Sequence, residues 1–405
     1  MLMLSSFRAV KPRFAPVILL GTVLLNTAYG AADAAGSTAS KVSKSSAATA
    51  APAQFDNPII KSDSQDPTSA KGPLIYTADP AALVHDGTLY LYTTHDEQTA
   101  LGKDYRMYDY RLWTSTDLIK WHNQGAVLRY SDFAWARGDA KTGNAYAHHV
   151  IARKDGSGNT KFYFYAAVEG GQTGGAFGFS IGVAVGDSPK GPFTDPRGMP
   201  MILLEDTAKD KQHSWRNIDP AVFVDDDGRA YLYWGNQQLW WVELEPDLVH
   251  LKGEKYQLDA QGRMQQRDSS EVKIHKVDSL PNFEEGPHLS KHHGIYYLVY
   301  AAGFPESLAY ATSSSATGPW QYRGIIMEPL PGTTTIHPAL FDFNGQTYLA
   351  YHNADLPGGG NYRRSVALDL VFFNPDGSIK PIVRTTTPTK TPAQAATTTG
   401  PAADE

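Results

Sequence analysis

Five polar residues stand at the same place in five repeats of one sequence pattern, and three of them are acidic. Each lies eight or nine residues before a glycine turn, and the set is Asp79, His149, Asp219, Glu285 and His337. Equivalent positions in a repeat take equivalent places in space, so side chains far apart in the sequence would meet near one axis. Carboxyl groups that meet repel one another when ionised, which raises the pKa of one of them. A protonated carboxyl group beside an ionised one is the arrangement that hydrolyses a glycosidic bond.

Proline follows four of these five positions, either directly or after a glycine. The segments are Asp79-Pro80, Asp219-Pro220, Glu285-Gly286-Pro287 and His337-Pro338. Proline favours an extended entry into a strand and donates no ladder hydrogen bond. We therefore expect each polar residue at the start of the innermost strand of its repeat, with its side chain directed into a central depression. One such dipeptide is an ordinary turn starter, and only the recurrence at one phase of the repeat favours a shared site.

The elements that must position these residues are strands. The glycine turns, at 87, 158, 228, 294 and 345, are each followed by an alternating aromatic stretch such as LYLYTT or IYYLVYAA, and no long helical period is present. The second half of each unit adds two short strands, and LWWVELEPDLVHLKG is its most diverged copy. Four strands in each of five units, repeated about every fifty to seventy residues, predict an all-β fold, a five-bladed β-propeller. A β-sandwich is the competing architecture, but it gives no reason for such a repeat.

Composition and the two ends of the chain complete this picture. The chain has 405 residues and a net charge of −6, which gives no basic footprint for nucleic acid. Residues 1–30 place basic residues before a short apolar run and small residues after it, which predicts a signal peptide and a secreted or periplasmic protein, with a single membrane helix as the alternative. Residues 31–56 and 385–405 lack large apolar side chains and are predicted to be a disordered leader and a disordered Thr/Pro/Ala tail. Residues 57–384 then form the catalytic propeller, expected to be monomeric and free of the membrane once the signal is cleaved.

The motifs together resemble those of glycoside hydrolase family 43. The resemblance covers roughly residues 75–381 and rests on ADP at 78–80, IDP at 218–220, EGP at 285–287, HPAL at 337–340 and the loop GGGNYRRS at 358–365. It implies a five-bladed propeller that acts on arabinose- and xylose-containing plant polysaccharides and inverts the anomeric configuration. Inversion requires the two carboxyl groups to stand about 6.5–9.5 Å apart, with room for a water. No catalytic cofactor is implied.

The resemblance also implies roles for the three acidic residues. Asp79 would be the general base, Glu285 the general acid, and Asp219 the residue that raises the pKa of the acid and holds it in place. Glu284 also precedes the Gly-Pro pair, but adjacent residues of a strand face opposite sides, so the acid is assigned to Glu285.

Two further residues match positions of that family near the axis. Arg364, in the GGGNYRRS loop, matches an arginine that reaches the sugar and the acid site, with Arg363 as the alternative. His337 resembles the axial histidine that contacts the site and helps to hold a central ion or water. A structural Ca²⁺ at the axis is therefore the one metal considered, and a hydrogen-bonded core histidine is the alternative.

The second repeat departs from the family pattern. The family's second blade usually opens with a Trp-Ala pair, whereas this chain has AYAHHV at 145–150. Tyr146 would then replace the tryptophan as a stacking wall, and His148 or His149 would line the pocket and contact the substrate. We interpret Trp113, Trp121, Trp215 and Trp320 as blade-packing residues, with Trp215 the one candidate for the border of the cleft.

Two other interpretations compete with this one. The invertase and levansucrase group has a similar propeller, but its RDP and Glu-Cys motifs are replaced here by IDP in a chain without cysteine. A carbohydrate-binding propeller lectin would repeat its ligand residues in every blade, whereas the axial set here reads Asp, His, Asp, Glu, His. We therefore expect an exo-acting α-L-arabinofuranosidase on arabinoxylan, with a β-xylosidase, or an endo-acting arabinanase or xylanase, as the alternatives.

Overall fold

The computed structural model of this chain describes residues 55–69, 71–97, 104–136, 143–170, 178–207 and 213–385. All of them belong to Pro52–Glu405, one of two compact units into which the chain divides. The predicted signal peptide, residues 31–54 of the predicted leader and residues 386–405 of the predicted tail lie outside these ranges. Within them, no helix is long and apolar enough to cross a membrane.

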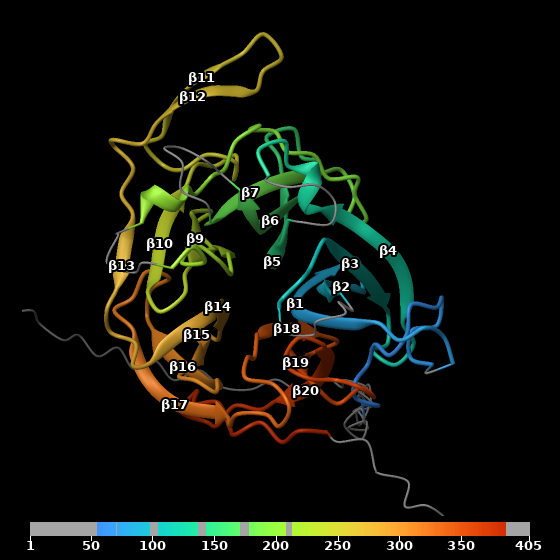
Figure 1. Cartoon of the computed structure of the whole chain (residues 1–405). Helices are drawn as coiled ribbons and strands as arrows, with labels where there is room; N and C mark the ends of the chain where they lie inside the picture. Colours follow the sequence, from blue (N-terminus) through green and yellow to red (C-terminus); the bar gives the residue numbers. More distant parts are fainter. Residues whose placement is uncertain are drawn as a thin grey trace, which may run out of the picture. The chain divides into compact units, whose positions relative to one another are not determined.

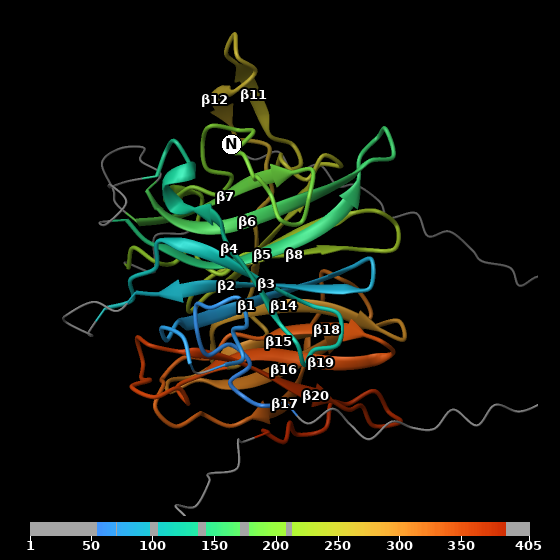
Figure 2. The ribbon, with the colours of Figure 1, turned by 90° about the vertical axis from the view of Figure 1, so that its right-hand side faces the viewer.

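Five antiparallel sheets stand around one axis, with the first strand of each sheet innermost (Figure 1). Seen edge-on, the strands of the different blades run along that axis (Figure 2). The fold is therefore the expected five-bladed β-propeller. The first three blades consist of β1 (Tyr76–His85), β2 (Thr88–Asp96), β3 (Asp109–Ser115) and β4 (His122–Arg129); β5 (Ala145–Lys154), β6 (Thr160–Gly170) and β7 (Gly178–Gly186); and β8 (Ala221–Val224), β9 (Ala230–Trp234), β10 (Leu239–Leu244) and β13 (His275–Val277). The last two consist of β14 (Phe283–His292), β15 (Ile295–Ala302), β16 (Ser307–Ser313) and β17 (Gln321–Met327); and β18 (Ala339–Phe343), β19 (Gln346–Asn353) and β20 (Ser365–Val371).

The expectation of four strands in every blade is wrong for blades 2 and 5, which have three each. After β7 the chain meets Pro189 and Pro192, and only isolated bridges such as Val185 to Thr194 join it to the sheet. After β20, the chain contains Pro375 and Pro381, and the bridge from Phe373 to Ile379 closes a turn within that segment. Proline lacks the N–H that a ladder needs, so these outer segments cannot pair as full strands.

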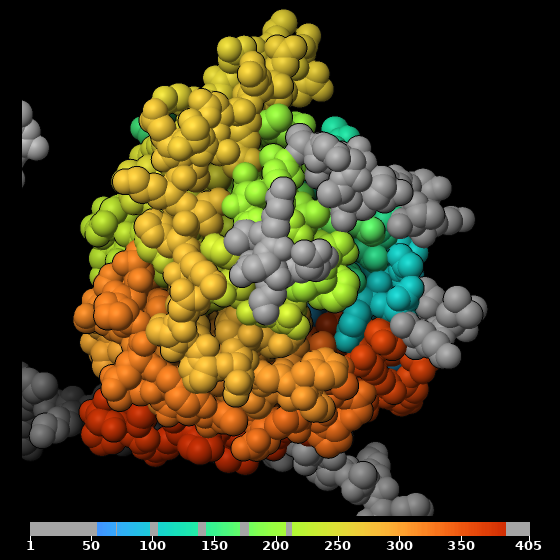
Figure 3. All heavy atoms as spheres, turned by 60° about the vertical axis from the view of Figure 1, so that its left-hand side comes forward, coloured from blue at the N-terminus to red at the C-terminus, as the bar shows by residue number. Residues whose placement is uncertain are grey.

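Blade 3 differs from its expected pattern in another way. Its fourth strand is β13, which pairs with β10, and the intervening residues form the hairpin of β11 (Lys255–Leu258) and β12 (Met264–Asp268). This hairpin projects from the blade and is visible in gold in Figure 3. Its base is held by Glu254, which accepts from Arg197 at 2.9 Å and from Arg267 at 2.7 Å, with all three side chains buried. Two short 3-10 helices, η1 (Tyr130–Asp132) and η2 (Leu204–Asp206), are the helical elements of the described ranges.

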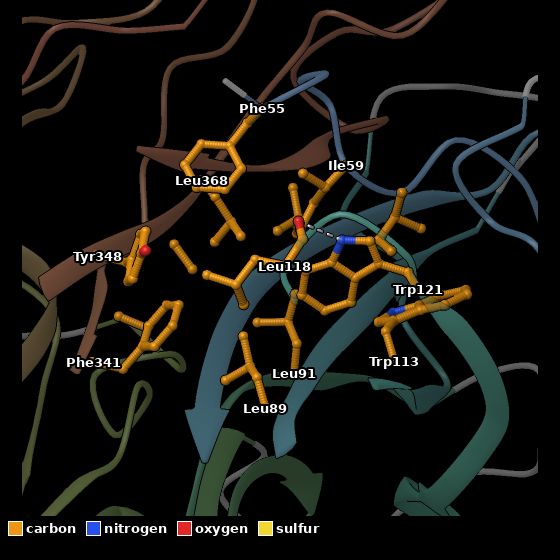
Figure 4. Close-up of a cluster of buried hydrophobic side chains, with 14 of the residues drawn as sticks. Phe55, Ile59, Leu89, Leu91, Trp113, Leu118, Trp121, Phe341, Tyr348 and Leu368 are labelled. Atoms are coloured by element: carbon orange, nitrogen blue, oxygen red, sulfur yellow. Dashed lines mark hydrogen bonds between the residues drawn. The ribbon is translucent and has the colours of Figure 1, made fainter. Parts of the chain in front are cut away.

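The first and last blades meet through an apolar cluster that also takes in the chain ahead of β1. Phe55 and Ile59 pack with Leu89, Leu91 and Trp113 of blade 1 and with Phe341, Tyr348 and Leu368 of blade 5 (Figure 4). The Asn57 side chain donates to the Leu368 carbonyl at 2.8 Å and accepts from its N–H at 3.0 Å. Phe55, which the sequence placed in the disordered leader, is thus part of the core.

The innermost strands are irregular where they carry the acidic residues. β1 has a bulge between Ala78 and Ala81, and within it Asp79 has a φ of 47°. Asp219, just before β8, has a φ of 60°, and the register of β14 shifts on both sides of Glu285. Positive φ is uncommon outside glycine, and aspartate is among the residues that tolerate it best. Asp79 and Asp219 thus carry backbone strain at the two positions where their blades present a carboxyl group to the axis.

Candidate active site

The three acidic side chains of the repeat meet in one pocket. The pocket has a volume of about 680 Å³, and Asp79, Asp219 and Glu285 all line it. Asp79 and Asp219 are buried, whereas Glu285 is partly exposed toward the pocket. Each residue comes from the entry of a different blade, as the repeat predicted. Glu284 lines the pocket too, because the bulge in β14 breaks the alternation on which its exclusion depended.

Asp79 is held as an ionised carboxylate. Its Oδ1 accepts a hydrogen bond from Arg364 at 3.0 Å, and its Oδ2 accepts one from the Thr94 hydroxyl at 2.9 Å. His352 Nδ1 lies 3.2 Å from Oδ1. Burial alone would raise the pKa of Asp79, but the charge of Arg364 and the contact with His352 outweigh it, so the pKa lies well below its usual range. Asp79 is therefore ready to accept a proton.

Arg364 joins Asp79 to a second carboxylate. Its Nε and one terminal nitrogen donate to Asp96 at 2.9 and 2.8 Å, and its guanidinium lies 4.9 Å from the ring centre of Tyr105. The residue is only 3% exposed. Two aspartates fix the plane of the guanidinium. The neighbouring Arg363, the alternative in the sequence, is exposed.

Asp219 and Glu285 interact through the backbone between Glu285 and Pro287. Asp219 Oδ2 accepts a hydrogen bond from the Gly286 N–H at 2.9 Å, and Glu285 Oε2 accepts one from the Asn236 amide at 2.8 Å. Burial raises the pKa of Glu285 well above its usual value, and the negative charge of Asp219 raises it further. The pocket thus holds a protonated carboxyl group and an ionised one together.

Comparison with known families agrees with this geometry. A model of "Glycosyl hydrolases family 43" matches residues 73–379, which include all five blades. The chain belongs to glycoside hydrolase family 43. It is therefore a glycoside hydrolase, as the sequence predicted.

Several relatives of this family 43 enzyme cover most of it. "Xylosidase/arabinosidase 43A" from Humicola insolens is 32% identical, over 75% of this chain and 96% of the relative. "Arabinoxylan arabinofuranohydrolase" from Bacillus subtilis is 31% identical over 75% of this chain, which spans 62% of that longer relative. The crystal structure of a GH43_1 enzyme from Xanthomonas citri superposes with a TM-score of 0.59 at 29% identity, over 76% of this chain and 91% of that one.

The two histidines of the second repeat that the sequence proposed for substrate contact do not line the pocket of this family 43 enzyme. The bulge of β5 between Ala145 and His148 brings Tyr146 and Ala147 to the pocket and leaves His149 farther along the strand. There the ring of His149 contacts that of His288, with the centres 5.8 Å apart. His148 is buried against Phe164, stacked with ring centres 5.0 Å apart, and does not line the pocket either.

His337 lies behind Asp219 and does not line the pocket. Its Nδ1 is 3.6 Å from Asp219 Oδ2, and a Cβ at Gly286 would come within 3.2 Å of the same nitrogen. Burial lowers the pKa of His337, but Asp219 outweighs that effect and raises it above its ordinary value. The residue thus supports Asp219 rather than a substrate.

The residues at the axis do not fit a Ca²⁺ held directly by protein ligands. His149 Nδ1 accepts from the Val222 N–H at 3.3 Å, His288 Nε2 lies 3.0 Å from a backbone carbonyl, and His337 Nδ1 faces Asp219. Calcium takes about six to eight oxygen ligands, whereas these donors are imidazole nitrogens. Across the described ranges, no group of three or more His, Asp or Glu side chains is placed to hold a metal ion. One solved relative, a β-xylosidase/α-arabinofuranosidase from a compost metagenome, is described in a calcium-free form.

Aromatic side chains form part of the pocket wall. Tyr146 lines it and stacks on Phe179, with ring centres 4.0 Å apart. Trp215 is 47% exposed and lines the pocket, so its assignment to blade packing is wrong. Phe304, 69% exposed, lines the same pocket. The other three tryptophans of that group, Trp113, Trp121 and Trp320, are buried in blade cores.

Several residues of the site escaped the sequence analysis. Asp96 and His352 lie at the end of the second strand of their blades, and Asn236 lies just after it. The motifs LYLYTTHD, AYLYWGN and TYLAYHN place a polar residue there in three repeats, and this is the signal that would have found them. Glu306 also lines the pocket, but it lies in a loop outside both repeated phases.

Proposed function

We propose that this enzyme is an exo-acting, inverting α-L-arabinofuranosidase that removes arabinose side chains from arabinoxylan. The observation that carries the proposal is the difference in protonation between Asp79 and Glu285 within one pocket. Arg364 and His352 favour the ionised form of Asp79, whereas burial and Asp219 favour the protonated form of Glu285.

The proposed reaction needs only these groups and one water. The water oxygen attacks the anomeric carbon, and Asp79 accepts a proton from that water. The bond from that carbon to the glycosidic oxygen breaks, and Glu285 gives its proton to the departing oxygen. Asp79 ends protonated and Glu285 ionised, and exchange with solvent restores both. Asp219 takes part in no bond change and keeps Glu285 protonated between turnovers.

The dimensions of the pocket support exo action. A volume of about 680 Å³ falls within the usual range for small-molecule sites and suits one or two sugar units better than a long polysaccharide segment. The names of the relatives support a pentose substrate, since they include arabinoxylan arabinofuranohydrolase and xylosidase/arabinosidase. A β-xylosidase is the second candidate, because a protein of that name from Xylanibacter ruminicola is 29% identical over 76% of this chain and 98% of its own.

Proton NMR of the products from arabinoxylan and from linear xylan tests the proposal. We expect arabinose from arabinoxylan, released first as the β anomer, and no xylose from linear xylan. Xylose from the ends of xylan would establish the β-xylosidase instead, and internal cleavage would establish an endo-acting enzyme. The α anomer as first product would overturn inversion. The variant Asp79→Asn serves as the inactive control.

Export of the enzyme, as a monomer, is part of this proposal, and the export rests on the signal-peptide pattern of residues 1–30. Amino-terminal sequencing of protein recovered from the periplasm or the medium should begin near residue 31. A full-length amino terminus in the cell interior would refute export, and size-exclusion chromatography checks the monomer.

A further inference from the structure

Glu306 is a carboxyl group in the pocket for which the reaction above has no use. It follows β15 in the loop that leads into β16, and it lines the same pocket as Asp79, Asp219 and Glu285. It is only 3% exposed. Buried carboxyl groups are costly, and an unexplained one in a pocket marks a functional position.

The side chain of Glu306 is fixed by the neighbouring blade. Its Oε2 accepts a hydrogen bond from the Ile336 N–H at 2.6 Å, and its own N–H donates to the Thr334 carbonyl at 3.0 Å. Thr334 in turn donates through its N–H and its hydroxyl to the Asn361 side chain, at 2.8 and 2.6 Å. This chain of contacts fixes one carboxyl oxygen, so the direction of the other is set before a ligand arrives.

Among the residues that the structure describes, no cation forms a salt bridge with this carboxyl group. In the described ranges, the salt bridges of the pocket go to Asp79, Asp96 and Asp219, and none reaches Glu306. Burial raises the pKa of Glu306 well above its usual value, against the opposing effect of the Ile336 N–H, and Glu285 raises it further whenever Glu285 is ionised. A neutral carboxyl group carries one O–H donor together with acceptor oxygens. A sugar hydroxyl, which both donates and accepts, is its natural partner.

We propose that Glu306 is a specificity-determining residue, and that its oxygen not held by Ile336 hydrogen-bonds one hydroxyl group of the sugar in the pocket. The proposal rests on the proposed glycosidase function and adds a residue that selects the sugar. A sugar lacking that hydroxyl leaves the buried carboxyl group unpaired, and a site built for a hydroxyl rejects such an analogue strongly.

A structural role is the competing explanation, because the bond to Ile336 also fastens the segment that leads to His337. The two explanations differ in one measurable respect. A structural fastening lowers activity on all substrates alike, whereas a contact to one hydroxyl makes the loss depend on whether the substrate carries that hydroxyl.

The test combines two variants with substrates that lack single hydroxyl groups. The kcat/KM of wild type, Glu306→Gln and Glu306→Ala is measured on an aryl α-L-arabinofuranoside, an aryl β-D-xyloside and their monodeoxy analogues. In the wild type, one deoxy position should cost about 10- to 100-fold. In Glu306→Ala, kcat/KM on the parent substrate should fall by a similar factor. Removing that hydroxyl from the substrate should then lower the kcat/KM of this variant by less than about threefold. Glu306→Gln, which stays neutral and keeps a donor and an acceptor, should retain most of the wild-type activity and selectivity.

The outcome that overturns the proposal is a Glu306→Ala enzyme with every deoxy penalty of the wild type intact. A thermal unfolding curve accompanies each variant, and if Glu306→Ala fails to fold, Glu306→Leu takes its place in the same comparison. A Glu306→Gln enzyme as impaired as the alanine variant would also overturn the proposal, because it would show that an ionised carboxylate is required.

A binding measurement separates this inference from the hydrolase function. Titration calorimetry with L-arabinose, D-xylose and their deoxy forms needs no turnover. Protein that binds a sugar with the predicted dependence on Glu306 but cleaves neither glycoside would overturn the function and support the contact. Protein that cleaves a glycoside but binds its sugar equally with and without Glu306 would overturn the contact alone. A wild type that binds neither sugar and cleaves neither glycoside would overturn both.

Discussion

Asp219 Oδ2 accepts a hydrogen bond from the backbone N–H of Gly286 at 2.9 Å, so one carboxyl group holds the peptide directly after Glu285. Burial is the larger cause of the raised pKa of Glu285, and the negative charge of the same aspartate raises this pKa further. Position and protonation of the acid therefore depend on one residue of a different blade.

The alkaline limb of the pH profile of kcat/KM should move in opposite directions in two variants. Asp219→Asn removes a charge that raises the pKa of Glu285, so the acid loses its proton at lower pH and the limb shifts down. Asn236→Ala removes a hydrogen bond that lowers this pKa, so the limb shifts up. Profiles of both variants and the wild type, measured in one buffer series, check the prediction. Shifts in the same direction would contradict it.

Glu285→Gln should lose activity according to the leaving group. The variant cannot protonate the departing oxygen, so we expect kcat on arabinoxylan to fall by about 10²- to 10⁴-fold. An aryl glycoside with a dinitrophenol leaving group, which departs as the anion, should lose far less. The matched control is Glu284→Gln, whose half-exposed carboxyl group faces Gln237, and it should lose less than about tenfold. Equal losses on both substrates would exclude Glu285 as the acid.

Arg364→Ala should destabilise the fold as well as abolish activity. It leaves Asp79 and Asp96 buried without their cation, which costs about 3–5 kcal/mol of unfolding free energy. The neighbouring Arg363 is exposed, so Arg363→Ala should change the unfolding free energy by less than about 0.5 kcal/mol. Urea unfolding at neutral pH compares the two variants with the wild type.

This cost should also depend on pH. Because the pKa of Asp79 is depressed in the fold, its pairing contributes fully above the ordinary aspartate pKa of about 3.9, and the contribution declines as the pH falls toward the folded value. The gap in stability between wild type and Arg364→Ala should therefore narrow in acid. A gap that widens there would contradict the assignment of the pair.

Trp215→Ala should weaken the binding of longer substrates. The half-exposed indole at the pocket offers a flat face to a second sugar unit, and its loss should raise KM for an oligosaccharide about three- to tenfold. An aryl pentoside should change less than about twofold. Phe372→Ala, which removes an aromatic ring of similar exposure outside the pocket, is the control. An equal effect of Trp215→Ala on both substrates would refute a second sugar position at this residue.

The repeat in the sequence predicted those features of the site that follow from the symmetry of the blades. It placed Asp79, Asp219 and Glu285 together because each starts an inner strand, and the resemblance supplied Arg364. It failed for His149 because the bulge of β5 shifts which residues reach the pocket, and such a bulge leaves no mark in the pattern of apolar residues.

Contacts between blades were equally hidden from the sequence. Asn236 meets Glu285 across 49 positions, and Glu306 is fixed by Ile336 across 30. Such pairs depend on how neighbouring sheets pack and on loops outside the repeat. The repeat marks Asn236 as a recurring polar position but does not name its partner, and it does not mark Glu306 at all.

The ion pair of Asp79 and Arg364 spans the joint between the first and last blades, 285 positions apart in the chain. During synthesis the aspartate therefore emerges long before its arginine, and the nascent protein stays inert until the fifth blade docks. A chain cut short before β20 would retain most of its sheets and still have no working base. Catalytic competence in this enzyme thus requires that synthesis has passed Arg364.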